Sequence, residues 1–303
     1  MSFCSELKND LCKEKKSLCC QVAECYGFML FGSSFSYKNI SLITENKNIA
    51  DRYSLFFKKN FAIIPGIRVT GKTNVRYTLT VNNPELCARV MTAFGYTGFD
   101  LLTINNDVFK RECCFSAFIR GAFLACGQMS DPYKNYHTEF VIRDFTLAIE
   151  FYSLLLERGL SPKRSMRGNS TVIYFNQAET IEELLTLMGA NKKVLEFIEV
   201  QVAKTIRNRE NRKNNIELSN INKQVDAAVN QGMAIKYLEE IGKLETLTDE
   251  LYNAALLRKA NPEASLSQLC KLSEESITRS GLNHRLRKIV EIAETLKTEI
   301  NNG

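Results

Sequence analysis

Three groups of residues in this sequence have types and spacings that could bind a ligand or catalyse a reaction. The first group, Gly66 to Thr73, fits the pattern G-x-x-x-x-G-K-[ST] of a nucleotide-binding loop. Such a loop holds phosphates when a helix follows it directly, because amides at the helix start bind the phosphate oxygens. The residues that follow, Val75 to Val81, alternate and are β-branched, which predicts a strand. We therefore interpret the match as chance, and nucleotide hydrolysis through Lys72 stays open as an alternative.

Two vicinal cysteine pairs, Cys19-Cys20 and Cys113-Cys114, form the second group. Thiolates are good zinc ligands, but neighbouring residues on a helix point about 100° apart, so one vicinal pair chelates an ion poorly. No C-x-x-C motif accompanies either pair. We predict thiols that pack at equivalent positions of two helices. The sequence therefore predicts neither a metal site nor a cofactor.

The third group lies on the last predicted helix, which starts after a cap at Thr278. Its apolar residues Leu282, Leu286 and Ile289 have helical spacing and predict an inward face. The predicted outward, DNA-binding side chains are Arg279, Ser280, Asn283, His284, Arg287 and Lys288. Arginine can pair with guanine, asparagine with adenine and serine with phosphate, so this face suits the major groove of DNA. An ordinary solvated basic face of a helical bundle is the alternative.

Further basic residues that could contact DNA phosphates occur in two other places. A polar segment without an apolar stripe, interpreted as a linker or arm, contains Arg207, Arg209, Arg212 and Lys213. Two predicted β-hairpins contain Arg68, Lys72 and Arg76 in the first, and Lys163, Arg164 and Arg167 in the second. The hairpins could straddle a duplex or could be ordinary solvated sheets, because charged hairpins are common on soluble proteins.

An internal duplication organises the first two thirds of the chain. Cys19 to Ser34 aligns without a gap with Cys113 to Gln128, and this places Gly27 opposite Gly121. Each copy predicts the order αββαββα, headed by a small-residue helix. The first copy predicts a strand at 40–44, a helix at 48–60, a hairpin within 62–81 and a helix at 84–94. The second predicts helices at 113–126, 145–158 and 180–188, a strand at 136–142 and a hairpin at 162–175.

The composition changes after this duplicated part, which indicates three regions. We expect a duplicated α+β domain at 1–190, with copies at about 19–95 and 113–190, a helical basic linker at 191–245 and an all-α domain at 246–303. One apolar face of the linker is predicted from Val225, Ala228, Val229 and Met233. In the last domain, a capping box at Ser265 opens a short helix whose predicted inward residues are Leu266, Leu269 and Leu272. A short helix, a turn and a basic helix form the helix-turn-helix order.

The overall composition is that of a globular protein of the cytoplasm. The chain has 303 residues, of which 45% are hydrophobic, and a mild net charge of +6. Its charged N-terminus has no apolar core, so we expect no signal peptide, and no apolar run is long enough to span a membrane. The ten cysteines then indicate reduced thiols.

The duplicated part resembles the LAGLIDADG homing endonuclease domain. The resemblance implies that Gly27 and Gly121 lie at the interface of the central helices, and that an acid before the final glycine of each motif binds the metal used in DNA cleavage. Gly32 and Cys126 stand at these acid positions. Mg²⁺ prefers carboxylate oxygens, which neither residue supplies. We therefore expect no catalytic residues and no enzyme activity, with a residually active homing endonuclease as the alternative.

Three further segments carry a resemblance over nearly the whole chain: Arg120 to Leu124, Ser130 to Pro132, and Ser280 to Leu286 near the end. They resemble the bacterial WhiA family, which joins a degenerate LAGLIDADG-like domain to a helix-turn-helix similar to region 4 of sigma factors. The resemblance implies a sequence-specific DNA-binding transcriptional regulator of sporulation, cell division or chromosome segregation. The implied partners are double-stranded DNA and RNA polymerase or a sigma factor. The chain is then expected to be associated with the nucleoid in the cytoplasm. We expect a monomer whose two copies are related by an internal pseudo-two-fold axis. A protein-binding scaffold on the chromosome is the alternative.

Overall fold

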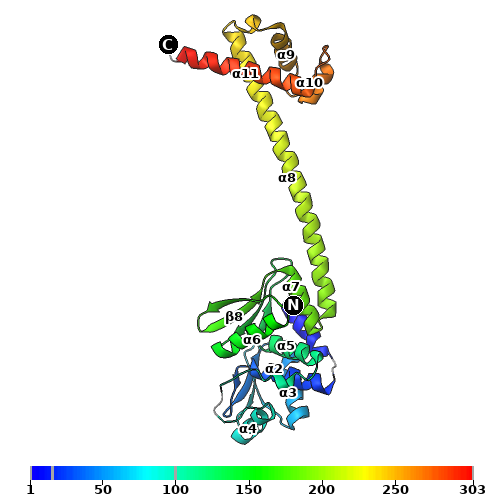
Figure 1. Cartoon of the computed structure of the whole chain (residues 1–303), viewed down its shortest axis with the longest axis vertical. Helices are drawn as coiled ribbons and strands as arrows, with labels where there is room; N and C mark the ends of the chain where they lie inside the picture. The colour runs from blue at the N-terminus through cyan, green and yellow to red at the C-terminus, as the bar shows by residue number, and fades with distance from the viewer. Residues whose placement is uncertain (1, 15–16, 99–100, 302–303) are drawn as a thin grey trace. The chain divides into compact units, whose positions relative to one another are not determined.

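Two compact units make up the chain in the computed structural model, which describes residues 2–14, 17–98 and 101–301 (Figure 1). The N-terminal unit is Met1–Lys204 and the C-terminal unit is Thr205–Gly303. The protein is of the α+β class, with two antiparallel sheets in the N-terminal unit and helices in the C-terminal unit. Among the described residues, no helix combines the length and the apolar character needed to cross a membrane.

The N-terminal unit contains the αββαββα arrangement twice, which confirms the order predicted from the duplication. The first copy consists of α2 (Leu18–Leu30), β1 (Ser34–Phe35), β2 (Ile40–Thr44), α3 (Lys47–Phe61), β3 (Gly66–Thr70), β4 (Arg76–Val81) and α4 (Pro84–Ala93). The second consists of α5 (Glu112–Cys126), β5 (Gly127–Met129), β6 (Thr138–Ile142), α6 (Phe145–Glu157), β7 (Lys163–Arg167), β8 (Ser170–Phe175) and α7 (Ala178–Met188). A helix that the sequence analysis did not predict, α1 (Phe3–Lys13), precedes the first copy, and the short helix η1 (Asn106–Val108) lies between the copies.

The two copies form sheets with equivalent strand orders, β1-β2-β4-β3 and β5-β6-β8-β7. Leu42 on β2 lies opposite Leu79 on β4, and Phe140 on β6 lies opposite Ile173 on β8. All four side chains are buried, because alternate residues of a strand face the same side of the sheet. Helix α3 packs against β2 and β4, and α6 packs against β6 and β8. The matching topology and register support the duplication independently of the sequence alignment.

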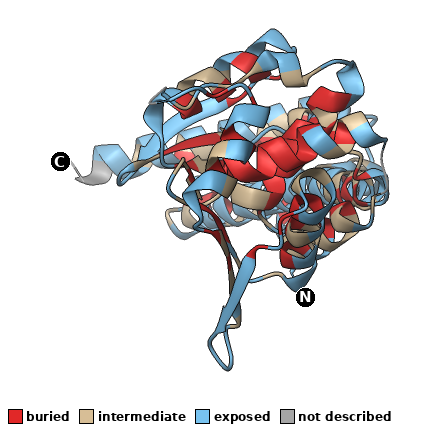
Figure 2. Ribbon diagram, turned by 90° about the horizontal axis from the view of Figure 1, so that it is seen from below, coloured by how far each residue is buried: buried red, intermediate tan, exposed pale blue. Residues whose placement is uncertain are grey.

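The central helices α2 and α5 approach each other closely at two glycines, as predicted. A Cβ atom on Gly27 would lie 2.3 Å from the Phe118 carbonyl oxygen, and one on Gly121 would lie 2.2 Å from the Glu24 carbonyl oxygen. Only glycine fits at these positions, because any side chain would collide with the backbone of the other helix. Figure 2 marks the buried residues in red, and they gather where helices and strands pack against one another.

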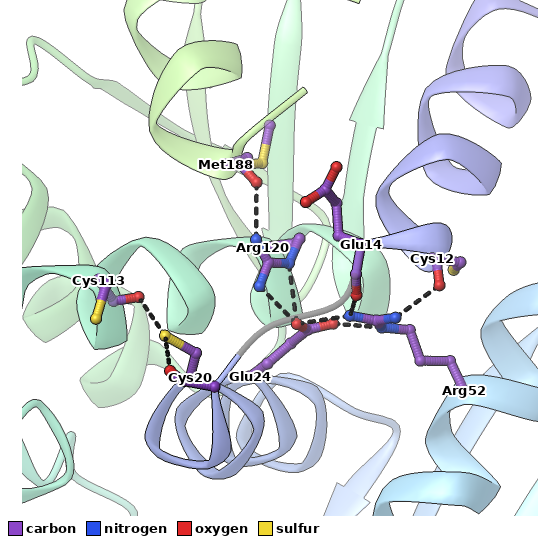
Figure 3. Close-up of polar contacts among 9 residues, drawn as sticks. Cys12, Glu14, Cys20, Glu24, Arg52, Cys113, Arg120 and Met188 are labelled. Atoms are coloured by element: carbon purple, nitrogen blue, oxygen red, sulfur yellow. Dashed lines mark hydrogen bonds and ion pairs between the residues drawn. The ribbon is translucent and has the colours of Figure 1, made fainter. Parts of the chain in front are cut away.

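One buried carboxylate and two guanidinium groups join the central helices to their surroundings (Figure 3). Arg120 on α5 donates to Glu24 on α2 at 2.7 Å and to the Met188 carbonyl at the end of α7 at 3.0 Å. Arg52 on α3 pairs with the same carboxylate and donates to the Cys12 carbonyl of α1 at 2.6 Å. The Glu24 side chain is completely buried, so these bonds replace its water shell.

The C-terminal unit is helical, with a core made from every helix that enters it. Its elements are the last part of α8 (Asn191–Glu240), η2 (Leu244–Thr246), α9 (Asp249–Ala260), α10 (Leu266–Leu272) and α11 (Arg279–Asn301). The predicted inward residues Leu282, Leu286 and Ile289 are buried, and the capping box at Ser265 is present. The helix-turn-helix order α10, turn, α11 is confirmed.

Two predictions about apolar faces in this unit are wrong. Leu272, at the last position of α10, is 55% exposed, because the helix ends there and the chain turns away from the core. On α8, Val225, Val229 and Met233 are exposed and Ala228 is half-buried, and the buried apolar residues lie nearer the end of the helix, at Ala234, Ile235 and Leu238. The register of a helix against its core depends on the partner helices, which periodicity alone does not specify.

Candidate nucleic-acid interface

Helix α11 presents an exposed row of polar and basic side chains along its N-terminal half. The Gly281 amide donates to Oγ1 of Thr278 at 3.1 Å, which caps the helix as the sequence predicts. Five of the six predicted DNA-binding side chains are exposed, and only Asn283 is half-buried; the exposed five are Arg279, Ser280, His284, Arg287 and Lys288. The inward leucines therefore orient this row toward solvent.

The basic residues of α11 divide into those used inside the unit and those left for a partner. Arg285 pairs with Glu275 in the turn at 2.8 Å and with Glu250 on α9 at 3.5 Å. Its side chain is 21% exposed and belongs to the internal structure of the unit. Within the described part of the chain, Arg279 and Arg287 make no ion pair. These two arginines are the strongest candidates for base or phosphate contacts on this helix.

The predicted arm is part of the continuous helix α8. Its four basic residues, Arg207, Arg209, Arg212 and Lys213, are all exposed. Lys213 lies 4.0 Å from Glu217 one turn later, and both side chains are exposed, so this pair is weak. A helix holds these cations in a fixed spacing that a flexible linker would not give.

The basic residues of the two hairpins are exposed, and some already have partners in the sheet. Strands β3 and β7 have every residue exposed. Arg167 on β7 donates to Glu139 on β6 at 2.8 Å, and this interaction, together with His137, holds the pKa of Glu139 below its usual value. Arg164 lies over the Tyr152 ring at 5.7 Å. The other predicted hairpin residues are Arg68, Lys72 and Lys163, which are exposed, and Arg76, which lies 3.7 Å from Glu45.

The predicted nucleotide-binding loop is a hairpin turn. Gly66 to Thr70 form β3, Gly71 has a φ of 88° in the turn, and β4 follows from Arg76. No helix starts after Thr73, so the described structure offers no helix amides to a phosphate. The interpretation of the motif as a chance match is supported.

A cleft of about 1020 Å³ lies at the C-terminal ends of the two central helices, where the resemblance places a metal-binding acid pair. Gly32 and Cys126 both line it, so the two acid positions do lie in one cavity. The carboxylates that line the cleft are Glu45, which is exposed beside Arg76, and Asp144, which accepts from the Leu147 amide at 2.8 Å as a helix cap.

The cleft is chemically unsuited to a hard metal cation. Burial raises the pKa of the Cys126 thiol to about 12, which keeps it neutral at physiological pH. Lys8 of α1 also lines the cleft, and burial lowers the pKa of its ammonium group. A lysine thus lines the cavity in which an active homing endonuclease would require carboxylates, and the sequence analysis missed it because α1 was not predicted.

The two vicinal cysteine pairs come together in space. The Sγ atoms of Cys19, Cys20, Cys113 and Cys114 all lie within 4.8 Å of one another. Cys20 and Cys114 are buried, Cys19 is half-buried and Cys113 is exposed. Hydrogen bonds from Ser17 and Cys114 lower the pKa of Cys19 to about 7. The sequence analysis considered each pair alone, and the structure brings them into one cluster.

Comparison with known proteins identifies both parts of the chain. Residues 211–293 match the model described as the WhiA C-terminal HTH domain, and residues 115–207 match the WhiA LAGLIDADG-like domain. A relative from Ruminiclostridium cellulolyticum, named "Probable cell division protein WhiA", is 32% identical over 98% of both chains. The chain belongs to the WhiA family.

Other WhiA proteins agree with this assignment over the full length. A Clostridium botulinum relative with the same printed name is 34% identical over 99% of this chain and 100% of its own. The crystal structure of full-length DUF199/WhiA from Thermatoga maritima matches with a TM-score of 0.56 and 24% identity, covering 97% of this chain and 99% of that one. This WhiA chain therefore has the same two-part fold.

The partners of two functional side chains of this WhiA chain could not have been identified from the sequence. Arg285 reads as one more basic residue of α11, although it is bound to two carboxylates of the same unit. Glu24 lies in an apolar helix, and its partners come from two other helices. A buried acid in an apolar helix does indicate that partners must exist, because an isolated buried charge is costly.

Proposed function

We propose that this WhiA chain is a sequence-specific DNA-binding transcriptional regulator that acts in bacterial cell division or sporulation and does not cleave DNA. The observation that carries the proposal is the exposed row on α11, which stands on a segment matched by the WhiA HTH model. In helix-turn-helix proteins the second helix lies in the major groove, with its N-terminal residues on the base edges. Arg279, Asn283 and Arg287 have the side chains suited to that position.

The decisive experiment is a gel-shift titration of the full chain on duplexes selected from a random library at fixed salt. Each of the changes Arg279→Ala and Arg287→Ala should weaken binding to the selected site by about 1–3 kcal/mol and relax its base preference. Asn283→Ala tests the half-buried member of the row. Lys236→Ala, which removes an exposed cation of α8, is the matched control and should leave base preference unchanged. Equal affinities of the three α11 variants and the Lys236→Ala control for the selected site would contradict the proposal that α11 contacts DNA.

The role of the α8 cations is tested by the salt dependence of the same titration. The logarithm of the affinity falls linearly with the logarithm of the salt concentration, and each phosphate contact makes this slope steeper. Replacing Arg207, Arg209 and Arg212 with alanine should therefore flatten the slope without changing which duplex is preferred. A slope that is flat in the unchanged protein would favour a protein-binding scaffold.

The chemistry of the cleft supports the proposal that the chain does not cleave DNA. Gly32 and Cys126 supply no carboxylate, Cys126 is neutral, and Lys8 supplies an amino group, which is not a ligand for a hard cation. Incubation with Mg²⁺ or Mn²⁺ and a large library of duplex sites should give no double-strand cleavage. Cleavage that disappeared on Lys8→Ala would identify an active centre in the cleft and overturn this part of the proposal.

RNA polymerase or a sigma factor is the protein partner we propose, with the chain acting as a monomer at the nucleoid. The support is the helix-turn-helix order of α10, turn and α11, together with the resemblance of the family's helix-turn-helix to region 4 of sigma factors. Purified polymerase core and holoenzyme, each passed over the immobilised full chain with and without promoter DNA, should separate direct binding from binding bridged by DNA.

A further inference from the structure

The four-cysteine cluster lies at the start of the two central helices, at the opposite end from the cleft. Cys19 and Cys20 belong to the first turn of α2, and Cys113 and Cys114 belong to the first turn of α5. Because the helices pack side by side at Gly27 and Gly121, their first turns are brought together as well. The close-up shows this juncture, where the Cys20 thiol lies 3.4 Å from the Cys113 carbonyl oxygen (Figure 3).

The distances fit four ligands around one ion. All four Sγ atoms lie within 4.8 Å of one another. Bonds of about 2.3 Å from zinc to sulfur place tetrahedral sulfurs about 3.8 Å apart, so small side-chain movements would close the site. A vicinal pair alone spreads its thiols around the helix, and the second helix supplies the two ligands that one pair lacks. Among the described residues, this is the only group of three or more such side chains gathered closely enough to hold an ion.

The donor set and its surroundings select a class of metal. Four sulfur atoms without a carboxylate or imidazole favour soft, thiophilic cations and disfavour Mg²⁺ or Ca²⁺. A tetrathiolate zinc site carries net negative charge, which the free amides and positive dipole ends of two helix N-termini offset. The Ser17 hydroxyl lies 3.3 Å from the sulfurs of both Cys19 and Cys20 and can donate to a bound thiolate.

We propose that Cys19, Cys20, Cys113 and Cys114 form one tetrathiolate site for a zinc-class divalent cation. The ion clamps the first turns of α2 and α5, and so fixes the two copies of the duplicated fold to each other at one end. This inference departs from the sequence prediction of unmetallated thiols. It is independent of the DNA binding proposed for α11, because no residue of the cluster belongs to the C-terminal unit.

Metal content is the first test. The full chain, purified under reducing conditions and equilibrated with Zn²⁺ followed by gel filtration, should retain about one zinc ion per chain by elemental mass spectrometry. Replacement by Co²⁺ should give thiolate-to-cobalt charge-transfer bands and the intense visible bands of tetrahedral cobalt. No retained zinc, or a cobalt spectrum of an oxygen-ligated octahedral ion, would overturn the proposal.

Matched variants locate the ion. Cys19→Ser with Cys113→Ser should abolish retention, whereas Cys4→Ser with Cys270→Ser, which removes the same number of thiols elsewhere, should leave it unchanged. Because Cys113 is exposed, its single replacement preserves packing and guards against misfolding of the double variant. Cys113→Ser alone should weaken zinc binding at least about tenfold in competition with a chelating indicator, the loss that even an outer-shell change causes.

Stability supplies a readout of the clamp. Removal of the ion with a chelator should lower the Tm of the unchanged protein, because a ligand bound only by the folded state stabilises it. The chelator should leave the Tm of the Cys19→Ser, Cys113→Ser variant unchanged. Two outcomes would overturn the zinc assignment. An iron–sulfur chromophore in anaerobically purified protein would show that the thiols bind a cluster. A disulfide within the cluster, formed in a glutathione buffer at the redox potential of the cytosol, would show that the thiols undergo oxidation.

Discussion

Glu24 is the charge on which the packing of the central helices most depends. Its buried carboxylate faces the guanidinium groups of Arg52 and Arg120, whose side chains are 12% and 2% exposed. Arg52 and Arg120 also donate to backbone carbonyls of α1 and at the end of α7. Together with its two arginine partners, this one side chain connects α2 to four other helices, and its loss would leave two cations without this counterion.

Replacement of Glu24 should be strongly destabilising. Glu24→Gln preserves the shape but removes the charge, and breaking a buried pair in this way costs about 3–5 kcal/mol in free energy of unfolding. Denaturant unfolding followed by circular dichroism measures the change. Glu157→Gln, at an exposed position of α6, is the control and should change stability by less than about 0.5 kcal/mol. Equal stability of the two variants would show that the pairing contributes little.

Gly121 allows a second prediction at this scale. Gly121→Ala would place a Cβ 2.2 Å from the Glu24 carbonyl oxygen, so the central helices must separate. We expect a loss of about 1–3 kcal/mol or more in the free energy of unfolding, as for overpacking in a dense core.

The matched control for Gly121→Ala is another helical glycine. A Cβ atom added to Gly232 on α8 would have no heavy atom within 4 Å, so Gly232→Ala should be neutral or stabilising by about 0.5–1 kcal/mol. Thermal unfolding of both variants would measure the difference. A Gly121→Ala protein as stable as the Gly232→Ala protein would contradict the close contact of the helices.

At the scale of elements, the turn between α10 and α11 is held to α11 and α9 by one carboxylate. Glu275 in the turn accepts from Arg285 of α11 at 2.8 Å and lies 3.3 Å from Nδ2 of Asn253 on α9. Hydrogen bonds from Arg285 first, and Asn253 second, hold the pKa of Glu275 below its ordinary value of 4.5. Helix α11 is thereby oriented by residues that lie outside its exposed row of polar and basic side chains.

This lowered pKa predicts a pH dependence with a definite sign. Because the folded state favours the carboxylate, the stabilisation is present above pH 4.5 and is lost as the pH falls through the lowered folded value. The side-chain carbon resonance of Glu275 should titrate below 4.5 in the full chain and near it in Arg285→Ala. The stability difference between the unchanged protein and Glu275→Gln should shrink on acidification. A normal titration midpoint in the unchanged protein would disprove the interaction.

At the scale of the whole molecule, the question is whether the duplicated unit also contacts DNA. Its exposed hairpins carry Arg68, Lys72 and Lys163, which form no ion pair within the described part of the chain. We expect these cations to add phosphate contacts, which strengthen binding to every sequence and carry no base preference.

Replacement of these three hairpin residues with alanine should weaken binding similarly on specific and random duplexes, and should reduce the salt slope by about one per lost contact. Titration by fluorescence anisotropy at several salt concentrations measures both effects. Glu179→Gln, which changes charge at an exposed position of α7 outside the hairpin strands, provides a comparison. An unchanged salt slope would show that the hairpins do not contact DNA, and would leave them as solvated surface or as part of a surface for a protein partner.

Local patterns in the sequence were sufficient for much of the fold. The small-residue pattern predicted the two central helices, and the alternation after Thr73 correctly separated a hairpin from a nucleotide-binding loop. The spacing of Leu282, Leu286 and Ile289 correctly oriented the last helix. These signals are local, because helix and strand periodicities are expressed within about ten residues.

The sequence by itself thus determined the duplicated fold, the helix-turn-helix and the loss of acids at Gly32 and Cys126. Only the tertiary structure decided that Glu24 joins Arg52 to Arg120, that Arg285 is bound within its own unit, and that Lys8 stands in the cleft. It also decided that two cysteine pairs, each a poor chelator, form one cluster. The physical reason is that each of these groupings brings together side chains from different elements, and their meeting depends on how helices pack across long separations in the chain.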